Sequence, residues 1–225
     1  MARPSRWTDV VEAAGEEFRS RGYDSATLED IAARVGILKG SIYNYVQSKE
    51  ELLLAVVERP AEVLLADLEQ LRNDDQQSAT VRLQALFRIQ VRVFSDHYPA
   101  AFVYLRNIGR TDLSDKFGKF TEMDARYMSI LEDLIADGVA RGEFNPPVGP
   151  RIAALSLVGI LNWMQHWFTP QGDDANRRLA DDLFAMALGG LTSGGSLARI
   201  LAGTHDAKPS PSVSGRDQTT TRSAR

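Results

Sequence analysis

The residues best suited to recognition chemistry lie together between positions 27 and 49, in TLEDIAARVGILKGSIYNYVQSK. Ile42 and Val46 are four residues apart, so both would face inward if residues 39–46 form a short helix. The outward face is then small, polar and aromatic, and consists of Lys39, Gly40, Ser41, Tyr43, Asn44 and Tyr45. Hydroxyl, amide and ammonium groups on such a helix are suited to the major groove of DNA.

A preceding helix and a tight turn are expected to position this face. Thr27 with Asp30 three residues later is typical of a capping box, in which the hydroxyl accepts an unpaired amide proton. An apolar stripe at helical spacing follows, made of Leu28, Ile31, Ala32 and Val35. Gly36 then ends the helix, because glycine enters the left-handed region without steric cost. The segment therefore predicts a helix-turn-helix.

The charge of the whole chain argues against nucleic-acid binding, whereas its local distribution favours it. Net charge is -4 and the sequence pI is about 5.5. No acidic residue occurs from position 31 to 49, where Arg34, Lys39 and Lys49 are found. The predicted face is therefore locally positive but makes few phosphate contacts per subunit, which favours a dimer that doubles them.

The stretch from Trp7 to Leu53 resembles the N-terminal domain of the tetracycline-repressor (TetR) family of bacterial regulators. The matching residues are spread over the whole stretch: Ala14, Phe18, Gly22, Tyr23, Thr27, Ile31, Ala32, Gly36, Gly40, Ser41, Tyr43, Ser48, Lys49, Glu51 and Leu52. Leu38 departs from the pattern, because the family commonly has Ser or Thr there to cap the recognition helix. Weaker capping at Lys39 is the expected consequence.

The resemblance implies a double-stranded DNA operator as the partner and a set of binding residues: Thr27, Lys39, Gly40, Ser41, Tyr43, Asn44, Tyr45 and Lys49. Phosphates would be held by Tyr43, Tyr45 and Lys49. Base edges would be faced by Lys39, Gly40, Ser41 and Asn44. Phosphate contacts set the register, and only the second group could specify sequence.

The remainder of the chain predicts further helices and no convincing strand, so the expected fold is all-α. Expected helices cover 7–21, a long stretch from 48 that Pro60 should kink or split, 79–96, 99–105, 114–140, 150–168 and 174–191. A polar break separates two of them at 73–78. We expect a DNA-binding domain over 1–53, a ligand-binding and dimerisation domain over 54–192, and a disordered tail over 193–225.

The C-terminal part extends the resemblance to relatives that control lipid or steroid breakdown and respond to acyl-coenzyme A thioesters. It has an aromatic pair, a proline, a glycine and a helix ending in paired glycines: Trp167, Phe168, Pro170, Gly172, Gly189 and Gly190. In this family the helices surround one cavity, here expected to be lined by Phe94, Phe102, Arg106, Met123, Tyr127, Leu131, Asn162, Trp163, His166 and Trp167. Arg106 or Arg110 would meet the phosphates of coenzyme A. A non-coenzyme-A aromatic or drug-like effector is the alternative.

The last two expected helices carry broad apolar faces, which predict a four-helix interface in a homodimer. The residues concerned are Leu155, Val158, Ile160 and Leu161 on the first, and Leu179, Leu183, Met186, Ala187 and Gly190 on the second. Packing within one subunit is the competing interpretation. The aromatic residues around His166 could likewise belong to a core or a dimer seam.

Catalysis is not expected, and neither is a metal or cofactor. The chain has no cysteine, and His97, His166 and His205 show no metal-ligand spacing. The neighbouring acids Glu132 and Asp133 would point apart on a helix. The start of the chain has no secretory signal and no apolar run is long enough to cross a bilayer, which predicts a cytoplasmic protein. A helical adaptor that does not bind DNA remains the rival to the regulator hypothesis.

Overall fold

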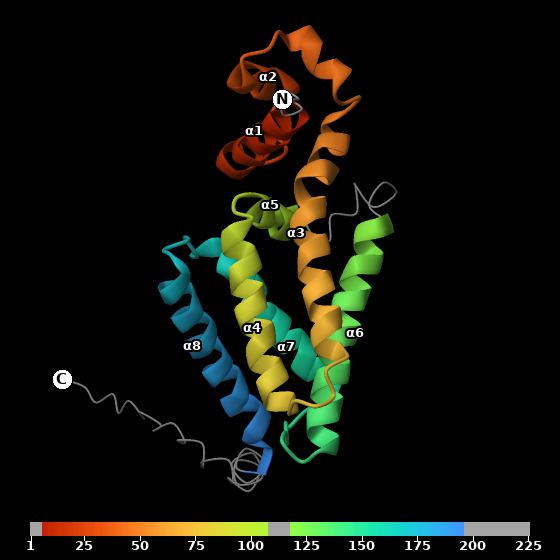
Figure 1. Cartoon of the computed structure of the whole chain (residues 1–225), viewed down its shortest axis with the longest axis vertical. Coiled ribbons are helices and arrows are strands. Elements are labelled where there is room, and N and C mark those ends of the chain that lie inside the picture. Colours follow the sequence, from red (N-terminus) through yellow and green to blue (C-terminus); the bar gives the residue numbers. More distant parts are fainter. Residues whose placement is uncertain (1–5, 108–117, 196–225) are drawn as a thin grey trace, which may run out of the picture.

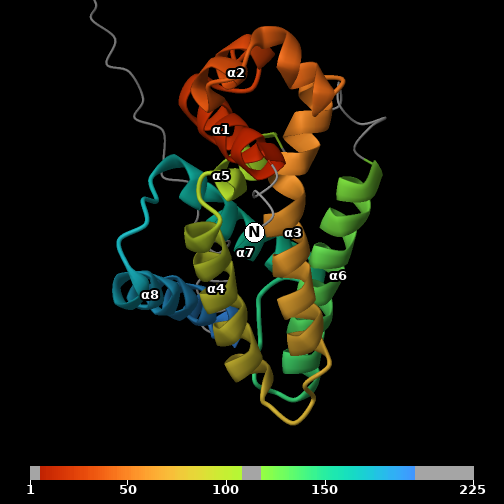
Figure 2. The ribbon, with the colours of Figure 1, turned by 45° about the horizontal axis from the view of Figure 1, so that its top comes forward.

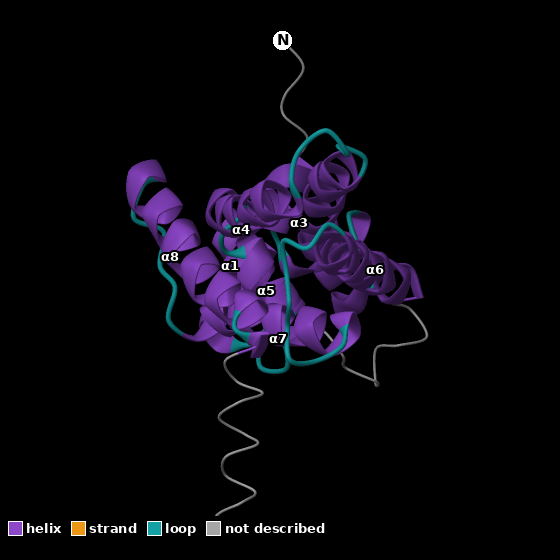
Figure 3. Cartoon of the chain, turned by 90° about the horizontal axis from the view of Figure 1, so that it is seen from below, coloured by secondary structure: helices purple, strands orange, loops and turns teal. Residues whose placement is uncertain are grey.

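The computed structural model describes residues 6–107 and 118–195, with side chains left undescribed at 118–120. Only helices, turns and loops occur in these ranges, as Figure 3 shows, so the all-α prediction is confirmed. The elements are α1 Arg6–Arg21, α2 Leu28–Val35, η1 Lys39–Asn44, α3 Lys49–Arg72, α4 Ala79–Asp96, α5 Ala100–Asn107, α6 Gly118–Ala140, α7 Pro150–Asn162, η3 Trp163–His166 and α8 Asp173–Thr192. No described helix is long and apolar enough to cross a membrane.

The helices form a small head and a longer body joined by α3. In Figure 1, α1 and α2 lie at one end, and α3 runs from there along the body beside α4 and α6. Helix α5 lies directly beneath α1 in Figure 2, where it contacts both α1 and α3. Helix α8 packs along α4, and α7 packs against α6. The body is therefore a layered helical bundle that holds the head through α3 and α5.

Helix α3 is continuous through Pro60, so of the two expected effects, a kink or a split, the split does not occur and the kink stays a prediction. Pro60 is buried inside a helix of 24 residues. One hydrophobic core follows this helix from Leu52 and Leu53 in the head to Leu65 and Leu68 in the body. The boundary expected between residues 53 and 54 consequently lies within α3, and the two halves share a helix as well as a core.

The start of α4 is fixed from a distant part of the sequence. Asn73–Ser78 forms the polar break that the sequence predicts, and the Ser78 hydroxyl accepts a hydrogen bond from the Val81 amide at 3.2 Å. Glu143, beyond α6, accepts bonds from the amides of Ala79 (3.0 Å) and Thr80 (2.8 Å). Burial raises the pKa of Glu143, but these hydrogen bonds outweigh it and hold the pKa below its ordinary value. The helix dipole also stabilises a carboxylate at a helix N-terminus.

The ends of the later helices differ from expectation. The helix expected over 150–168 ends at Asn162 and continues as the short 3-10 helix η3. The helix expected from residue 114 is described from Gly118, and its first residues lie outside the described ranges, as does nearly all of the expected tail. Gly138 lets the Phe144 ring pack closely against α6, because the ring occupies the space that a Cβ atom on Gly138 would need.

Candidate DNA interface and effector cavity

The helix-turn-helix forms as its local sequence predicts. The Thr27 hydroxyl accepts a hydrogen bond from the Asp30 amide at 3.1 Å, and the Asp30 carboxylate accepts one from the Thr27 amide at 3.2 Å. This capping box occupies the polar atoms of Thr27, which therefore positions α2. Gly36 has φ 71°, the left-handed conformation expected at the end of α2. Leu38 precedes η1 without a side-chain cap, as expected, and its side chain is 80% exposed.

The recognition element is a 3-10 helix over Lys39–Asn44, shorter than the helix expected to reach Val46. Ile42 and Val46 are buried, as predicted. The side chains of Lys39 and Asn44 are exposed, Tyr43 is 56% exposed, and Gly40 is exposed, whereas Ser41 and Tyr45 are half-buried.

The positive charge of this face is partly paired in space. Lys39 Nζ lies 2.6 Å from Glu29 Oε2 on α2, and the hydrogen bond to Glu29 raises the pKa of Lys39. Arg34 Nη2 lies 2.7 Å from Glu17 Oε1 on α1. The absence of acids between positions 31 and 49 therefore does not produce an unpaired positive surface. Exposed ion pairs of this kind are weak, so a phosphate or a base can displace Glu29 from Lys39.

Lys49 has a structural role that differs from the expected phosphate contact. Its ammonium donates to the backbone carbonyls of Tyr23 (2.9 Å), Asp24 (3.2 Å) and Ala26 (3.1 Å). It also lies 4.5 Å from the centroid of the Tyr23 ring. An ammonium group has three N–H donors, and all three are used. Lys49 thus ties the start of α3 to the loop between α1 and α2, and a phosphate could bind it only by displacing a carbonyl.

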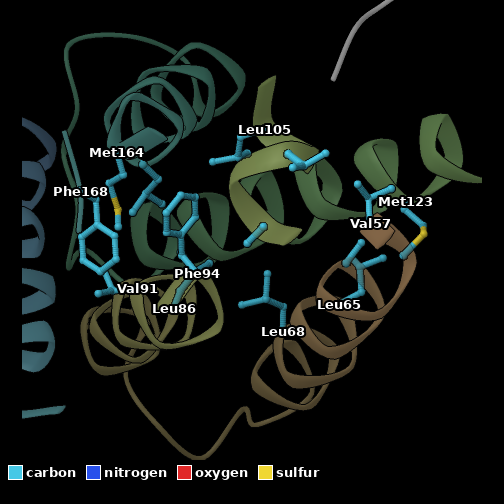
Figure 4. Close-up of a cluster of buried hydrophobic side chains, with 14 of the residues drawn as sticks. Val57, Leu65, Leu68, Leu86, Val91, Phe94, Leu105, Met123, Met164 and Phe168 are labelled. Carbon is cyan, nitrogen blue, oxygen red and sulfur yellow. The ribbon is translucent and has the colours of Figure 1, made fainter. Parts of the chain in front are cut away.

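A cavity of about 130 Å³ lies between α3, α4, α5, α6 and α7. Its lining includes three residues of the expected set, Met123, Tyr127 and Asn162. The apolar wall contains Leu65, Leu105 and Met123, whose side chains are drawn in Figure 4. The other lining residues are Ala61, Leu64, Gln90, Tyr104, Asp124, Met128 and Val158.

Polar groups accompany this apolar wall, among them Tyr104, Asp124 and Gln90, which the sequence did not single out. The Tyr104 hydroxyl donates a hydrogen bond to Asp124 Oδ1. Burial raises the pKa of Asp124 despite that hydrogen bond, and burial also raises the pKa of Tyr127. Gln90 lies on α4 among mainly apolar buried residues. It faces a cavity because four other helices pack around it, which the sequence of α4 alone does not show.

Most of the expected cavity residues lie elsewhere. Leu131 is fully buried in the core, and Phe94 lines a neighbouring cavity of only about 20 Å³. Phe102 packs against Tyr98. The guanidinium of exposed Arg106 lies over the Phe102 ring, 5.5 Å from the ring centroid. Leu131, Phe102 and Arg106 therefore do not line the cavity of about 130 Å³, and Arg110 lies outside the described residues.

The side chains of Trp163, His166 and Trp167, which follow α7, are exposed and do not line the cavity of about 130 Å³. Trp163 is 62% exposed and stacks on exposed His166, with ring centroids 4.1 Å apart. Trp167 is 49% exposed and borders a separate shallow pocket with Phe168. A short 3-10 turn after Asn162 rotates these rings away from the helical face that Asn162 shares with Val158.

Exposed apolar side chains continue along α7 and α8. Ile152, Leu155 and Met186 are exposed, with Met186 at 77%. By contrast, Leu161 and Ala187, which the sequence placed on the same apolar faces, are buried inside the subunit. Solvent-exposed leucine, isoleucine and methionine on adjacent helices form a candidate contact surface for another protein.

Comparison with known proteins gives two matches to family models. Residues 10–56 match bacterial regulatory proteins of the tetR family. Residues 76–191 match the tetracyclin repressor-like C-terminal domain. The first match covers the helix-turn-helix and the start of α3, and the second runs from the turn before α4 to the end of α8. Between them lie residues 57–75, which form the rest of α3 and the beginning of the turn after it.

Individual relatives agree with these matches. The HTH-type transcriptional repressor KstR2 of Mycobacterium tuberculosis H37Rv is 25% identical over 192 residues, 85% of this chain and 95% of the repressor. The structure of the ketosteroid transcriptional regulator KstR2 has the same fold, with a TM-score of 0.75, 24% identity, and coverage of 84% of this chain and 96% of that one. AibR in complex with isovaleryl coenzyme A and operator DNA is similar with a TM-score of 0.66 and 25% identity, over 81% of this chain and 97% of AibR.

Proposed function

The chain belongs to the tetR family of bacterial regulatory proteins, and from this premise we propose that it represses transcription by binding a palindromic operator as a homodimer. The single observation that carries the proposal is the exposed face of Lys39, Gly40, Tyr43 and Asn44, held by a capped α2 and a buried Ile42. Two such faces in a symmetric dimer read half-sites about one turn of DNA apart.

The dimer is proposed to form through α7 and α8. Ile152, Leu155 and Met186 are exposed on these helices, and burying them against a second copy removes apolar surface from water. An isologous contact of this kind presents the same patch from both subunits, which suits a palindromic DNA site.

We further propose that a small hydrophobic effector enters the cavity around Tyr127 and releases the operator. AibR has been solved with isovaleryl coenzyme A and DNA, which supports an acyl-coenzyme A as the effector class here. The acyl group would lie in the cavity, and the larger coenzyme A portion would remain outside it. Binding favours a conformation whose paired recognition elements no longer match the operator, so the population shifts away from the DNA-bound form.

Operator binding is tested by selecting genomic fragments with the purified protein and measuring affinity by fluorescence anisotropy. Lys39→Ala should weaken binding to the selected operator and relax its preference at particular bases. Arg126→Ala is the matched control, since Arg126 is an exposed cation in an ion pair with Glu69 at 2.9 Å but lies on α6, away from both the DNA face and the proposed dimer surface. No selection of any fragment, or equal losses in the two variants, would contradict this assignment of the interface.

Effector release is tested separately on the same protein–operator complex. Titration with acyl-coenzyme A thioesters of increasing chain length should raise the free DNA fraction, with coenzyme A alone as the control. If operator binding is intact and neither thioesters nor drug-like aromatic compounds change it, the effector part of the proposal fails while the DNA-binding part stands.

A further inference from the structure

The size of the cavity restricts what it can enclose. Pockets for drug-sized ligands usually measure about 300–1,000 Å³. The cavity here measures about 130 Å³, close to an engineered apolar cavity of about 150 Å³ that binds benzene. A group of roughly four to six carbon atoms therefore fills it, whereas a long fatty chain or a ring system as large as a steroid would exceed it.

Two polar atoms in this cavity lack the hydrogen bonds that buried groups normally make. Among the residues that the structure describes, no partner contacts the buried Gln90 Oε1 or the buried Tyr127 hydroxyl. Both residues line the cavity. Since the large majority of buried polar side-chain atoms are paired in folded proteins, these two atoms mark a place where a bound molecule supplies the missing partners.

The electrostatic surroundings favour a molecule without charge at this end. The described lining contains no lysine, arginine or histidine, and its one ionisable carboxyl group belongs to Asp124. Tyr104 already donates its hydroxyl hydrogen to Asp124. An anionic group would lose its hydration and meet no cation here, which costs far more free energy than burying a neutral hydroxyl that finds partners.

The hydrogen-bonding capacity of the two side chains selects the polar group. Gln90 presents an acceptor oxygen and a donor amide, and the Tyr127 hydroxyl can donate or accept. A hydroxyl group on the ligand also donates and accepts, so it can pair with Gln90 Oε1 and with Tyr127 at once. A plain hydrocarbon chain would leave both atoms unpaired.

We propose that this cavity recognises a short, uncharged acyl group that carries a hydroxyl, with Gln90 and Tyr127 as the residues that select the hydroxyl. The inference rests on the proposed effector function and names the class of acyl group that the cavity accepts. The thioester-bearing end leads out of the cavity toward the larger, charged part of the ligand. The volume of the cavity limits the length of the acyl chain. The two unpaired atoms favour a chain that carries a hydroxyl over a plain hydrocarbon chain.

The test compares butyryl-coenzyme A with 3-hydroxybutyryl-coenzyme A by calorimetric titration of the full chain. Two hydrogen bonds of about 1 kcal/mol each should make the hydroxylated thioester bind about tenfold or more tightly. Tyr127→Phe and Gln90→Met each nearly keep the side-chain volume and should reduce that preference, because each removes one of the two partners of the ligand hydroxyl. Tyr98→Phe removes a hydroxyl outside the cavity and should leave the preference unchanged.

Hexadecanoyl-coenzyme A supplies the size arm of the test and should bind at least tenfold more weakly than the hydroxylated short thioester. Equal binding of the two four-carbon thioesters by the unaltered protein overturns the inference, as does a preference that survives in the Tyr127→Phe, Gln90→Met double variant. Those outcomes leave the effector function intact, because some thioester still binds. Failure of every thioester to bind removes the effector function together with this inference.

Discussion

The contacts of Lys49 lead to a prediction that separates a structural role from a DNA-binding one. Lys49→Met keeps the length of the side chain but removes the ammonium that three carbonyls share. A hydrogen bond to a charged group contributes about 1.5–3 kcal/mol, but water can reach the partly exposed carbonyls and recover much of it. Adding a cation–π contact with Tyr23 of about 0.5–1 kcal/mol gives a net loss near 2–3 kcal/mol.

That loss should lower the melting temperature of the folded chain by about 5–10 °C, because 1 kcal/mol shifts a protein of this size by about 2–4 °C. The assay is thermal unfolding followed by circular dichroism, with Lys39→Met as the matched control. Lys39 is exposed, and its hydrogen bond within the described part of the chain goes to exposed Glu29, so its replacement should leave the melting temperature unchanged. At a temperature where Lys49→Met is folded, the salt dependence of operator binding should equal that of the parent. An unchanged melting temperature with a shallower salt dependence would refute the reasoning and restore the phosphate contact.

Three other outcomes follow from single contacts. Leu38, exposed just before η1, should contact a thymine methyl group in the operator. Replacing thymine with deoxyuridine at one position per half-site should therefore weaken binding of the parent protein, whereas binding of the Leu38→Ser variant should not change. Met186→Glu should convert dimers to monomers in light scattering without loss of helicity, since Met186 makes the subunit surface apolar but is not part of its core. Glu143→Gln should destabilise the chain at neutral pH in denaturant titrations. The difference should begin to shrink as pH falls below roughly 4 and should vanish only below the lowered pKa of the folded chain, because the carboxyl stabilises the fold only while it is ionised.

The features predicted from the sequence are those whose contacts span three or four residues. The capping box of Thr27 and Asp30 and the left-handed Gly36 depend on neighbours along one helix. The limits of α4 follow from a serine cap and an apolar repeat, and the predicted and observed bounds agree. Such local interactions can be predicted from the sequence, because helical periodicity determines which residues contact one another.

The features missed from the sequence depend on partners far apart along the chain. Lys49 meets carbonyls 23 to 26 residues away, and Lys39 meets Glu29 across the turn. Gln90 faces the cavity only because α3, α5, α6 and α7 assemble around it. Trp163 was misplaced because an α-helix was extended past Asn162, and the change to a 3-10 turn moves its ring outward. Neither composition nor periodicity carries information about these long-range packings.

The continuity of α3 through Pro60 makes this helix a single arm between the proposed DNA interface and the cavity. Lys49 ties one end to the head, and Leu65 borders the cavity 16 residues further along. At a rise of 1.5 Å per residue, these points are about 24 Å apart. A tilt of about 5° around the cavity end would therefore move the head by about 2 Å, and by about 4 Å between the two heads of a symmetric dimer, against a half-site spacing of about 34 Å. A small change in the position of a ligand hydroxyl in the cavity can therefore produce a much larger displacement of the recognition elements, because the helix is long. The displaced elements no longer fit the DNA grooves of the two half-sites.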